Sequence, residues 1–453
     1  MTAKALMPVR ILDLVAPLDH KSTAMHTHGD RSLVASEPGA VTALIGSGLR
    51  RGDVVSATVA LPGTRTSTTA TRTTTTRAPS SALAPSADPD LFYQLAVAHS
   101  DCVRGKRSSL TVLEFEADLE RNLCDLHDEL LAGTYRPGRS ICFPISRPKV
   151  REVWAARVRD RIVHHLLYNK IAARFHAAFA AGSSACIPGR GTLRAAERLE
   201  HNIRSITQNW SRPAFYLKLD LANFFVSIDK HVVFELLAKR ISEPWWLDLA
   251  HLVLFHDPRG DVEVRGNRDL LRRVPPHKSL FNAPADTGLP IGNLSSQFFA
   301  NVQLDALDQR CKHQLRARYY ERYVDDFIML HESPQWLNEA REDLEAWLPA
   351  RLHLQINPSK TVLQPVHRGV DFVGHLIKPW RRITRPRTAV SALHRLHEAS
   401  AEDLFELTNS YLGLHTQASH GHADRARVAN IARRRGHCVA ADLCKVYRRA
   451  ANN

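Results

Sequence analysis

The sequence has no run of about 18 apolar residues, so no transmembrane helix is expected. Its first residues lack the charged and then apolar pattern of a signal peptide. The 7 cysteines are scattered without a CxxC pair, and the 24 histidines include no HExxH spacing. These absences argue against a membrane protein, a disulfide-bonded secreted domain and a zinc site. We expect a cytoplasmic protein with reduced thiols.

Acidic residues are too few to balance the basic ones: 61 lysines and arginines stand against 46 aspartates and glutamates, for a net charge of +15. A surplus of this size favours a polyanionic partner, either nucleic acid or an anionic membrane. The 453 residues can form two or three domains, and a hydrophobic content of 44% is normal for a globular protein.

The N-terminal region differs in composition from the rest of the chain. Residues 63–89 are dominated by Thr, Ser, Ala and Pro, with four consecutive threonines at 73–76. Such a stretch has too little apolar surface to offset the entropy that is lost on ordering. Residues 1–89 are therefore predicted to be an N-terminal extension that is disordered or of low complexity, and we assign it no function.

The most informative stretch surrounds Asp325 and Asp326. Tyrosines at 319, 320 and 323 precede this pair, and the apolar residues 327–330 follow it. This pattern predicts a strand, a tight turn that carries the acids, and a second strand. Two adjacent carboxylates at one site require a cation, and oxygen ligands suit magnesium or manganese. Taken alone, an Asp-Asp pair is more often a solvated turn.

A second aspartate, Asp220, ends another predicted strand. Residues 215, 217 and 219 are apolar and alternate with Tyr216 and Lys218, which is the period of a strand with one face on the core. A lone aspartate at a strand end would usually cap the next helix. Two phenylalanines follow at 224 and 225, and ordinary core packing suits Phe224 better than Phe225.

Two further segments carry candidate binding residues. Lys149 and Arg151 lie in a basic segment after a short strand predicted at 141–145, where they can hold a triphosphate or a nucleic-acid backbone or form a solvated basic face. Gln297 lies in a glycine-marked loop, residues 288–301, that runs into a helix. Further helices are predicted at 113–131, 195–206 and 336–352 from their apolar spacing.

The order of these features resembles a polymerase palm: an aspartate at a strand end, a glycine-containing helix entry and an Asp-Asp hairpin. Residues 323–326 (Tyr-Val-Asp-Asp) resemble the Tyr-x-Asp-Asp box of reverse transcriptases. Further resemblances to this family lie at 218–228 (first palm motif), 371–377 (primer-grip hairpin), and 148–151 and 159–161 (fingers of the bacterial enzymes). The resemblance to this family covers roughly residues 90–420.

This resemblance implies an α/β (α+β) fold, the right-hand polymerase fold. The fingers would cover residues 90–212, the palm with the Asp-Asp hairpin and the primer grip 213–378, and a basic helical thumb 379–453. The implied activity is RNA-directed DNA polymerisation by two-metal nucleotidyl transfer. The implied partners are an RNA template, a DNA or RNA primer, dNTPs and an accessory protein, but no membrane.

The resemblance also implies roles for individual residues. Asp220 and Asp325 would bind two Mg²⁺ ions, or Mn²⁺, and Asp326 would support them as a third catalytic and metal-binding residue. The dNTP-binding residues would be Lys149 and Arg151 at the triphosphate, Phe225 against a 2′-hydroxyl, Gln297 beside the templating pair and Lys360 at the departing pyrophosphate.

The type of reverse transcriptase is indicated by residues 291–297 (Ile-Gly-Asn-Leu-Ser-Ser-Gln). The Ile-Gly-x-x-x-Ser-Gln form resembles diversity-generating retroelements, whereas group II intron enzymes usually carry Gln-Gly-x-x-x-Ser-Pro. Defence-associated and group II intron-like bacterial enzymes are the alternatives, and a non-catalytic RNA-binding scaffold is a third. The presence of all three acids and of both fingers residues argues against the scaffold.

Overall fold

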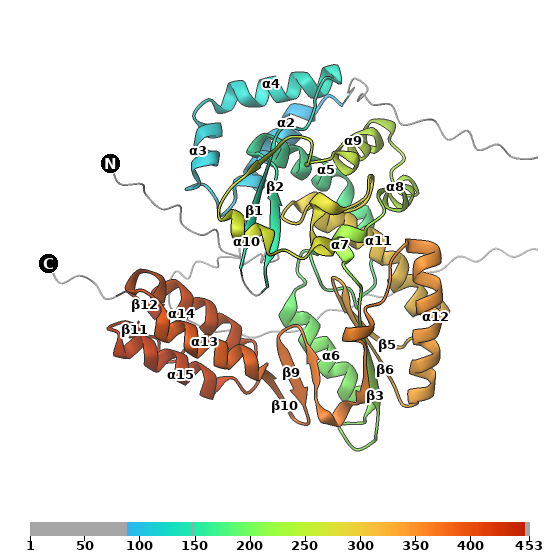
Figure 1. Ribbon diagram of the computed structural model, residues 1–453, viewed down its shortest axis with the longest axis vertical. Helices are drawn as coiled ribbons and strands as arrows, with labels where there is room; N and C mark the ends of the chain where they lie inside the picture. Colours follow the sequence, from blue (N-terminus) through green and yellow to red (C-terminus); the bar gives the residue numbers. More distant parts are fainter. Residues whose placement is uncertain (1–87, 147–148, 449–453) are drawn as a thin grey trace, which may run out of the picture. The chain divides into compact units, whose positions relative to one another are not determined.

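The computed structural model describes residues 88–146 and 149–448, and these residues fall in one unit of helices and strands (Figure 1). The α+β class expected from the sequence is confirmed. The predicted low-complexity extension, residues 1–89, lies almost entirely outside the described residues, as do residues 147 and 148 of the basic segment.

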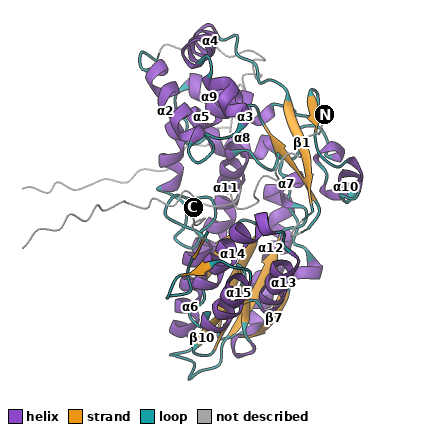
Figure 2. Cartoon of the chain, turned by 90° about the vertical axis from the view of Figure 1, so that its left-hand side faces the viewer, coloured by secondary structure: helices purple, strands orange, loops and turns teal. Residues whose placement is uncertain are grey.

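Residues 91–309 are mainly helical, as the purple ribbons of Figure 2 show. Their helices are α2 (Leu91–Val103), α3 (Leu110–Glu116), α4 (Leu119–Ala132), α5 (Val158–His176), α6 (Thr192–Ile206), α7 (Phe224–Ser227), α8 (Lys230–Ala238), α9 (Pro244–Phe255), α10 (Arg268–Arg272) and α11 (Leu294–Gln309). The helix predicted at 113–131 is divided in two, because the chain leaves the helix at Ala117 and Asp118. The Asn122 amide donates to the Phe115 carbonyl (2.9 Å), which satisfies an orphan acceptor at the end of α3.

A four-stranded antiparallel sheet, in the order β5-β6-β3-β7, organises the middle of the chain. Its strands are β3 (Phe215–Asp220), β5 (Tyr319–Tyr323), β6 (Asp326–His331) and β7 (Val362–Pro365). Helix α6 lies on one side of this sheet and α12 (Pro334–Leu352) on the other (Figure 1). The helices predicted at 195–206 and 336–352 are therefore confirmed.

Alternation along the strands divides the core between the two faces. Leu217, Leu219 and Phe327 belong to the large apolar cluster that includes α11 and α12. Tyr216 and Ile328 pack in a second cluster with the apolar face of α6. Because side chains alternate along a strand, Lys218 and Asp220 share the face of Tyr216.

Two three-stranded sheets flank this centre. One consists of β1 (Ser140–Ile145), β2 (Arg151–Ala155) and β4 (Val262–Val264), and the other of β8 (Val370–Phe372), β9 (His375–Lys378) and β10 (Arg381–Thr384). The strand predicted at 141–145 and the hairpin predicted at 371–377 are both confirmed.

The C-terminal segment is helical, with a small hairpin at its end. It contains α13 (Pro386–Glu398), α14 (Ala401–Thr416), α15 (His422–Arg434), β11 (Cys438–Val439) and β12 (Val446–Tyr447). Arg382 of β10 is buried and links this segment to α6, since it donates to Glu200 (2.7 Å) and to the Gln417 carbonyl (3.1 Å). Among the residues that the structure describes, no helix is long and apolar enough to cross a membrane.

Candidate active site at the Asp-Asp turn

The Asp-Asp pair lies at a two-residue turn. Tyr323 ends β5 and pairs with Asp326, the first residue of β6, so only Val324 and Asp325 form the turn. The predicted strand, turn and strand are confirmed, but the turn was predicted to carry both acids and Asp326 instead begins β6. Val324 has φ +55°, a left-handed conformation that is unfavourable for a β-branched residue by about 1–3 kcal/mol. Glycine, asparagine or aspartate usually occupies such a position in a hairpin turn.

A buried arginine lies directly behind this turn. Arg322 is fully buried and binds both oxygens of Asp308 on α11, from Nε and Nη2 at 2.7 Å each. It also donates to Ser183 Oγ (2.8 Å) and to Asn301 Oδ1 (3.2 Å). Its remaining contact is with the turn, where Nη1 donates to the Val324 carbonyl (3.2 Å). The ion pair raises the pKa of Arg322 above its ordinary value, against the effect of burial, so this buried charge is paired.

Asp220 lies beside the turn because of the strand register. It is the direct cross-strand partner of Asp326 in the antiparallel pair β3 and β6, and it is buried. Lys360 donates to Asp220 Oδ1 from Nζ at 2.6 Å, and Asn357 donates to the same oxygen at 3.3 Å. The structure therefore brings Asp220, Asp326 and Lys360 together, and their roles in one site stay predictions.

Lys218 contributes a second positive charge. It lies two residues before Asp220 on the same strand face, with Nζ 3.5 Å from Asp326 Oδ2. The same ammonium donates to the Asp371 carbonyl of β8 at 3.1 Å. Lys218 therefore links the Asp-Asp turn to the hairpin that resembles a primer grip.

Crowding of the carboxylates alters their protonation. Burial, followed by the charges of Asp220 and Asp326, raises the pKa of Asp325 to about 6. Burial also raises the pKa of Asp326, which Lys218 opposes and Asp220 reinforces. Carboxylates that repel one another in this way bind protons or cations more tightly than isolated ones.

The three carboxylates fit a divalent cation in charge and ligand type, because carboxylate oxygens are the ligands that Mg²⁺ and Mn²⁺ prefer. Across residues 88–146 and 149–448, however, no group of three or more acidic, histidine or cysteine side chains is gathered closely enough to form a ready-made metal site. Lys360 and Lys218 are bound to carboxylate oxygens instead. Metal binding here would require these oxygens to exchange an ammonium partner for the cation.

The predicted triphosphate-binding residues lie on another element. Lys149 precedes β2 and Arg151 begins it, and both are exposed. Neither side chain forms an ion pair or a hydrogen bond with another residue in the described part of the chain, so both charges are available for a ligand. The structure shows no contact between these two residues and the three carboxylates.

The other two predicted dNTP-binding residues lie on neighbouring segments. Phe225 is half-buried in α7, whereas Phe224 is 3% exposed and belongs to the core. The carbonyl of Phe225 accepts from the Leu289 N–H at 2.8 Å, which joins α7 to the segment that leads into α11. Gln297 is half-buried in the first turn of α11. The roles that the sequence assigned to these two side chains stay predictions.

The loop before α11 lies against the backbone of β2 at Gly292, where there is no room for a side chain. Gly292 has φ +128°, and a Cβ there would lie 2.4 Å from the Trp154 carbonyl oxygen. The neighbouring Ile291 carbonyl accepts from the Trp154 N–H at 2.7 Å, and Asn293 Oδ1 accepts from the Ala156 N–H at 3.0 Å. The loop is therefore fixed directly on the backbone of β2 and its continuation.

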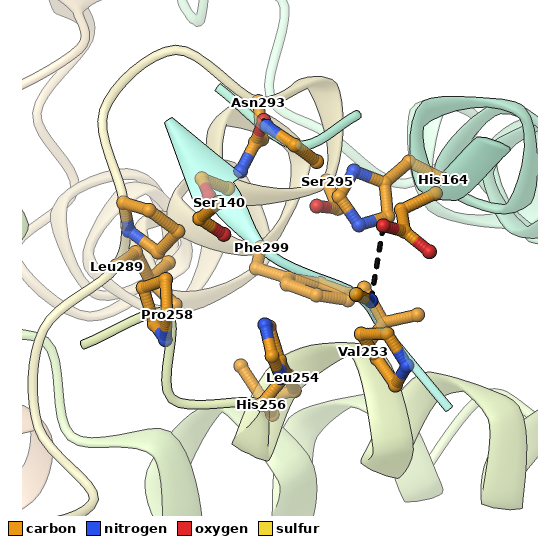
Figure 3. A pocket seen from close by; sticks show the side chains of 16 residues that line it. Ser140, His164, Val253, Leu254, His256, Pro258, Leu289, Asn293, Ser295 and Phe299 are labelled. Carbon is orange, nitrogen blue, oxygen red and sulfur yellow. Dashed lines mark hydrogen bonds between the residues drawn. The ribbon is translucent and has the colours of Figure 1, made fainter. Parts of the chain in front are cut away.

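A small pocket lies between β1, α5, α9 and the start of α11 (Figure 3). His164 and Ser295 point into it, and Asp160 accepts from the Gly138 N–H at 3.1 Å. Burial lowers the pKa of His164 to about 3, so this imidazole is neutral. The residues that line the pocket include none of the predicted site residues.

Four residues near the site were not assigned a role from the sequence: Lys218, Arg322, Asp308 and Asn357. The position of Lys218 could have been predicted, because side chains two residues apart on a strand lie on the same face, here the face of Asp220. No local pattern indicates that Arg322 pairs with Asp308, because the two belong to different elements.

The chain is similar to several known proteins. The chain is 24% identical over 316 residues to Protein YkfC of Escherichia coli (strain K12), which covers 61% of this chain and 76% of that protein. Among solved structures it resembles apo telomerase from Candida tropicalis truncated from its C-terminal domain (TM-score 0.40, 14% identity, 53% of each chain). It also resembles telomerase from Candida albicans in complex with a fragment of telomeric RNA (TM-score 0.38, 12% identity, 66% of this chain and 55% of that chain). The chain spans little more than half the length of either telomerase.

The family match covers the site itself. Residues 146–377, just over half of the 453, match the family described as reverse transcriptase (RNA-dependent DNA polymerase). This range contains Asp220, the Asp-Asp turn, Lys149, Arg151 and Lys360. The chain belongs to the reverse transcriptase family of RNA-dependent DNA polymerases.

Proposed function

We propose that this chain copies an RNA template into DNA by two-metal nucleotidyl transfer and serves a diversity-generating retroelement. The observation that carries the proposal is the meeting of Asp220 and Asp326 across β3 and β6, beside Asp325 in a strained turn. When bound, two Mg²⁺ or Mn²⁺ ions would activate the primer 3′-hydroxyl and neutralise the charge of the leaving pyrophosphate.

The chain's own residues would bind and orient the substrates. Asp220 and Asp325 would supply carboxylate oxygens in the ionised state, with Asp326 in support. Lys149 and Arg151 would hold the incoming triphosphate through charge-assisted hydrogen bonds, which their exposed side chains favour. Lys360, bound to Asp220 in this structure, would release that oxygen and assist the departing pyrophosphate.

Two residues would control which nucleotide is added. Phe225, half-buried next to the core residue Phe224, would exclude a 2′-hydroxyl and so select deoxynucleotides. Gln297, in the first turn of α11, would lie beside the templating pair. Because Gly292 fixes this loop on β2, the templating position would be joined rigidly to the triphosphate-binding strand.

The retroelement subtype rests on residues 291–297, whose Ile-Gly-x-x-x-Ser-Gln form accompanies low fidelity at template adenines in such elements. The proposed partners are an RNA template, a DNA or RNA primer, dNTPs and an accessory protein. We also propose that the protein acts in the cytoplasm, as its scattered, unpaired cysteines favour.

The proposal is tested by extending a DNA primer on an RNA template with Mg²⁺ or Mn²⁺ and sequencing the product. We expect synthesis by the wild type, none by Asp325→Ala, and errors concentrated opposite template adenines. The double variant Lys149→Ala/Arg151→Ala should raise the KM for dNTP about ten-fold or more while RNA binding is retained.

The outcomes separate the alternatives. Faithful synthesis would retain the polymerase and favour the defence-associated or group II intron-like reading over the diversity-generating one. No synthesis, even with an accessory protein added, would favour the RNA-binding scaffold, because a chain of charge +15 binds RNA through its phosphates whether or not it catalyses. If Asp325→Ala lost RNA binding together with synthesis, the result would mean that this residue maintains the fold.

A further inference from the structure

We infer that Arg322 is a positioning residue for the metal site: through its buried pair with Asp308 it holds the Val324–Asp325 turn in the conformation in which Asp325 can bind a divalent cation. The inference rests on the proposed function and deepens it, because it assigns the geometry of that site to a residue outside it. Arg322 touches no substrate in this scheme. It acts through the turn.

The turn requires external support. Val324 is held at φ +55°, where its branched Cβ is crowded by the backbone, and the residue would by itself adopt a negative φ. Asp325 is the next residue, so a change in the Val324 backbone redirects the Asp325 side chain. The pairing of Tyr323 with Asp326 constrains the strand ends but leaves the two turn residues outside the ladder.

Arg322 is placed to supply this support. The guanidinium is planar and rigid, and four of its hydrogen bonds go to Asp308, Ser183 and Asn301. These partners come from α11 and from the loop before α6, so two separate segments of the chain hold the Arg322 guanidinium. The position of its bond to the Val324 carbonyl (3.2 Å) is thereby fixed.

The experiment measures Mn²⁺ binding to the full chain by the electron paramagnetic resonance signal of free Mn²⁺. Arg322→Lys keeps the charge, but a point-like ammonium cannot bind Asp308 through two bonds and Val324 at the same time. We expect its dissociation constant for Mn²⁺ to rise about ten-fold, toward that of Asp325→Asn. Far-ultraviolet circular dichroism and the thermal midpoint establish that the variant is folded.

Two further variants separate positioning from a merely structural role. Arg322→Lys combined with Val324→Gly should recover most of the lost affinity, because glycine adopts a positive φ without strain. Tyr320→Phe removes the 2.6 Å bond from the Tyr320 hydroxyl to Asp308 but leaves the arginine contact with the turn intact. It should lower the thermal midpoint without changing Mn²⁺ affinity.

A pair of turn variants tests the inference even if Arg322→Lys does not fold. Val324→Pro locks φ near −65° and should weaken Mn²⁺ binding about ten-fold, whereas Val324→Gly should bind nearly as the wild type does. Wild-type affinity in Val324→Pro, or in folded Arg322→Lys, would overturn the inference. So would a double variant that stays as weak as Arg322→Lys alone. Because Mn²⁺ binding needs no template or synthesis, a wild type that binds Mn²⁺ but makes no DNA would contradict the proposed function alone.

Discussion

Asp220 and Asp326 face each other directly across the antiparallel strands β3 and β6. Like charges at such a position destabilise a sheet, since their Cβ atoms lie about 4.5–5.5 Å apart. Two lysines reduce this repulsion: Lys360 forms an ion pair with Asp220, and Lys218 forms one with Asp326. The site is therefore a balance of three negative and two positive side chains, and each of these charges can be tested.

Asp325→Asn should stabilise the protein when no metal is present. The pKa of Asp325 is raised in the folded state to about 6, so folding opposes its ionisation. This loss of stability is absent below the unfolded pKa, grows as the pH rises above that value, and is complete once the pH exceeds about 6. At pH 8 in chelator, we expect Asn to raise the free energy of unfolding by about 1–3 kcal/mol, measured by urea titration. An equal gain at pH 4 would contradict this explanation.

Lys218→Met should shift the pH at which polymerase activity falls on the acid side of its pH profile, here called the acid limb. Lys218 lowers the pKa of Asp326, so its loss leaves burial and Asp220 to raise that pKa further. We expect the limb to shift to higher pH by about half to one unit, because solvent screens this partly exposed pair. Single-turnover primer extension between pH 5.5 and 9 measures it. Lys218→Arg is the control that keeps the charge, and an unshifted profile for Lys218→Met would refute the role.

Phe225→Ala should admit ribonucleotides. Removing the ring would open the space that a 2′-hydroxyl needs, and we expect the preference for dNTP over rNTP in kcat/KM to fall at least about ten-fold. The matched control is Phe224→Ala, which should lower the free energy of unfolding by about 3–5 kcal/mol and leave sugar selectivity unchanged, because Phe224 is a core residue. Unchanged selectivity in Phe225→Ala would exclude the gate.

Gly292→Ala should damage both stability and synthesis. The new Cβ would lie 2.4 Å from the Trp154 carbonyl oxygen, at φ +128°. We expect the free energy of unfolding to fall by about 2 kcal/mol or more. Gly413 in α14 is the control: a Cβ there meets nothing within 4 Å, so Gly413→Ala should be neutral or stabilising by up to about 1 kcal/mol. Equal effects of the two variants would contradict the close-approach argument.

Family membership confirms the right-hand polymerase fold that the motifs predicted. The boundaries of the predicted fingers, palm and thumb (90–212, 213–378 and 379–453) stay predictions. Strand periodicity located β3, and the aromatic and apolar flanks of the acids located the turn, because both signals are local. The division of the segment at 113–131 into two helices was missed, since the apolar spacing continues across the break at Asp118.

The support of the site could not be read from the sequence. Val324 gives no warning of a positive φ, because a valine in a strand-like run predicts an extended backbone. The pairing of Arg322 with Asp308 depends on the packing of β5 against the end of α11, which no local pattern encodes. The bond from Lys360 to Asp220 spans 140 residues. Such contacts appear only once the tertiary fold is known.

The central sheet also determines when the site can form. Strand β3 pairs with β6 and with β7, which follow it by more than a hundred positions in the sequence. Asp220 therefore cannot reach its final position in the sheet until those later strands have been synthesised. Pairing of such distant segments is slow, because the entropy of closing the loop is lost before any contact compensates for it. During synthesis on the ribosome, the three carboxylates cannot reach their final surroundings until the chain has been made beyond β7. Until then the nascent chain exposes unpaired strand edges, which makes this period the one most prone to aggregation.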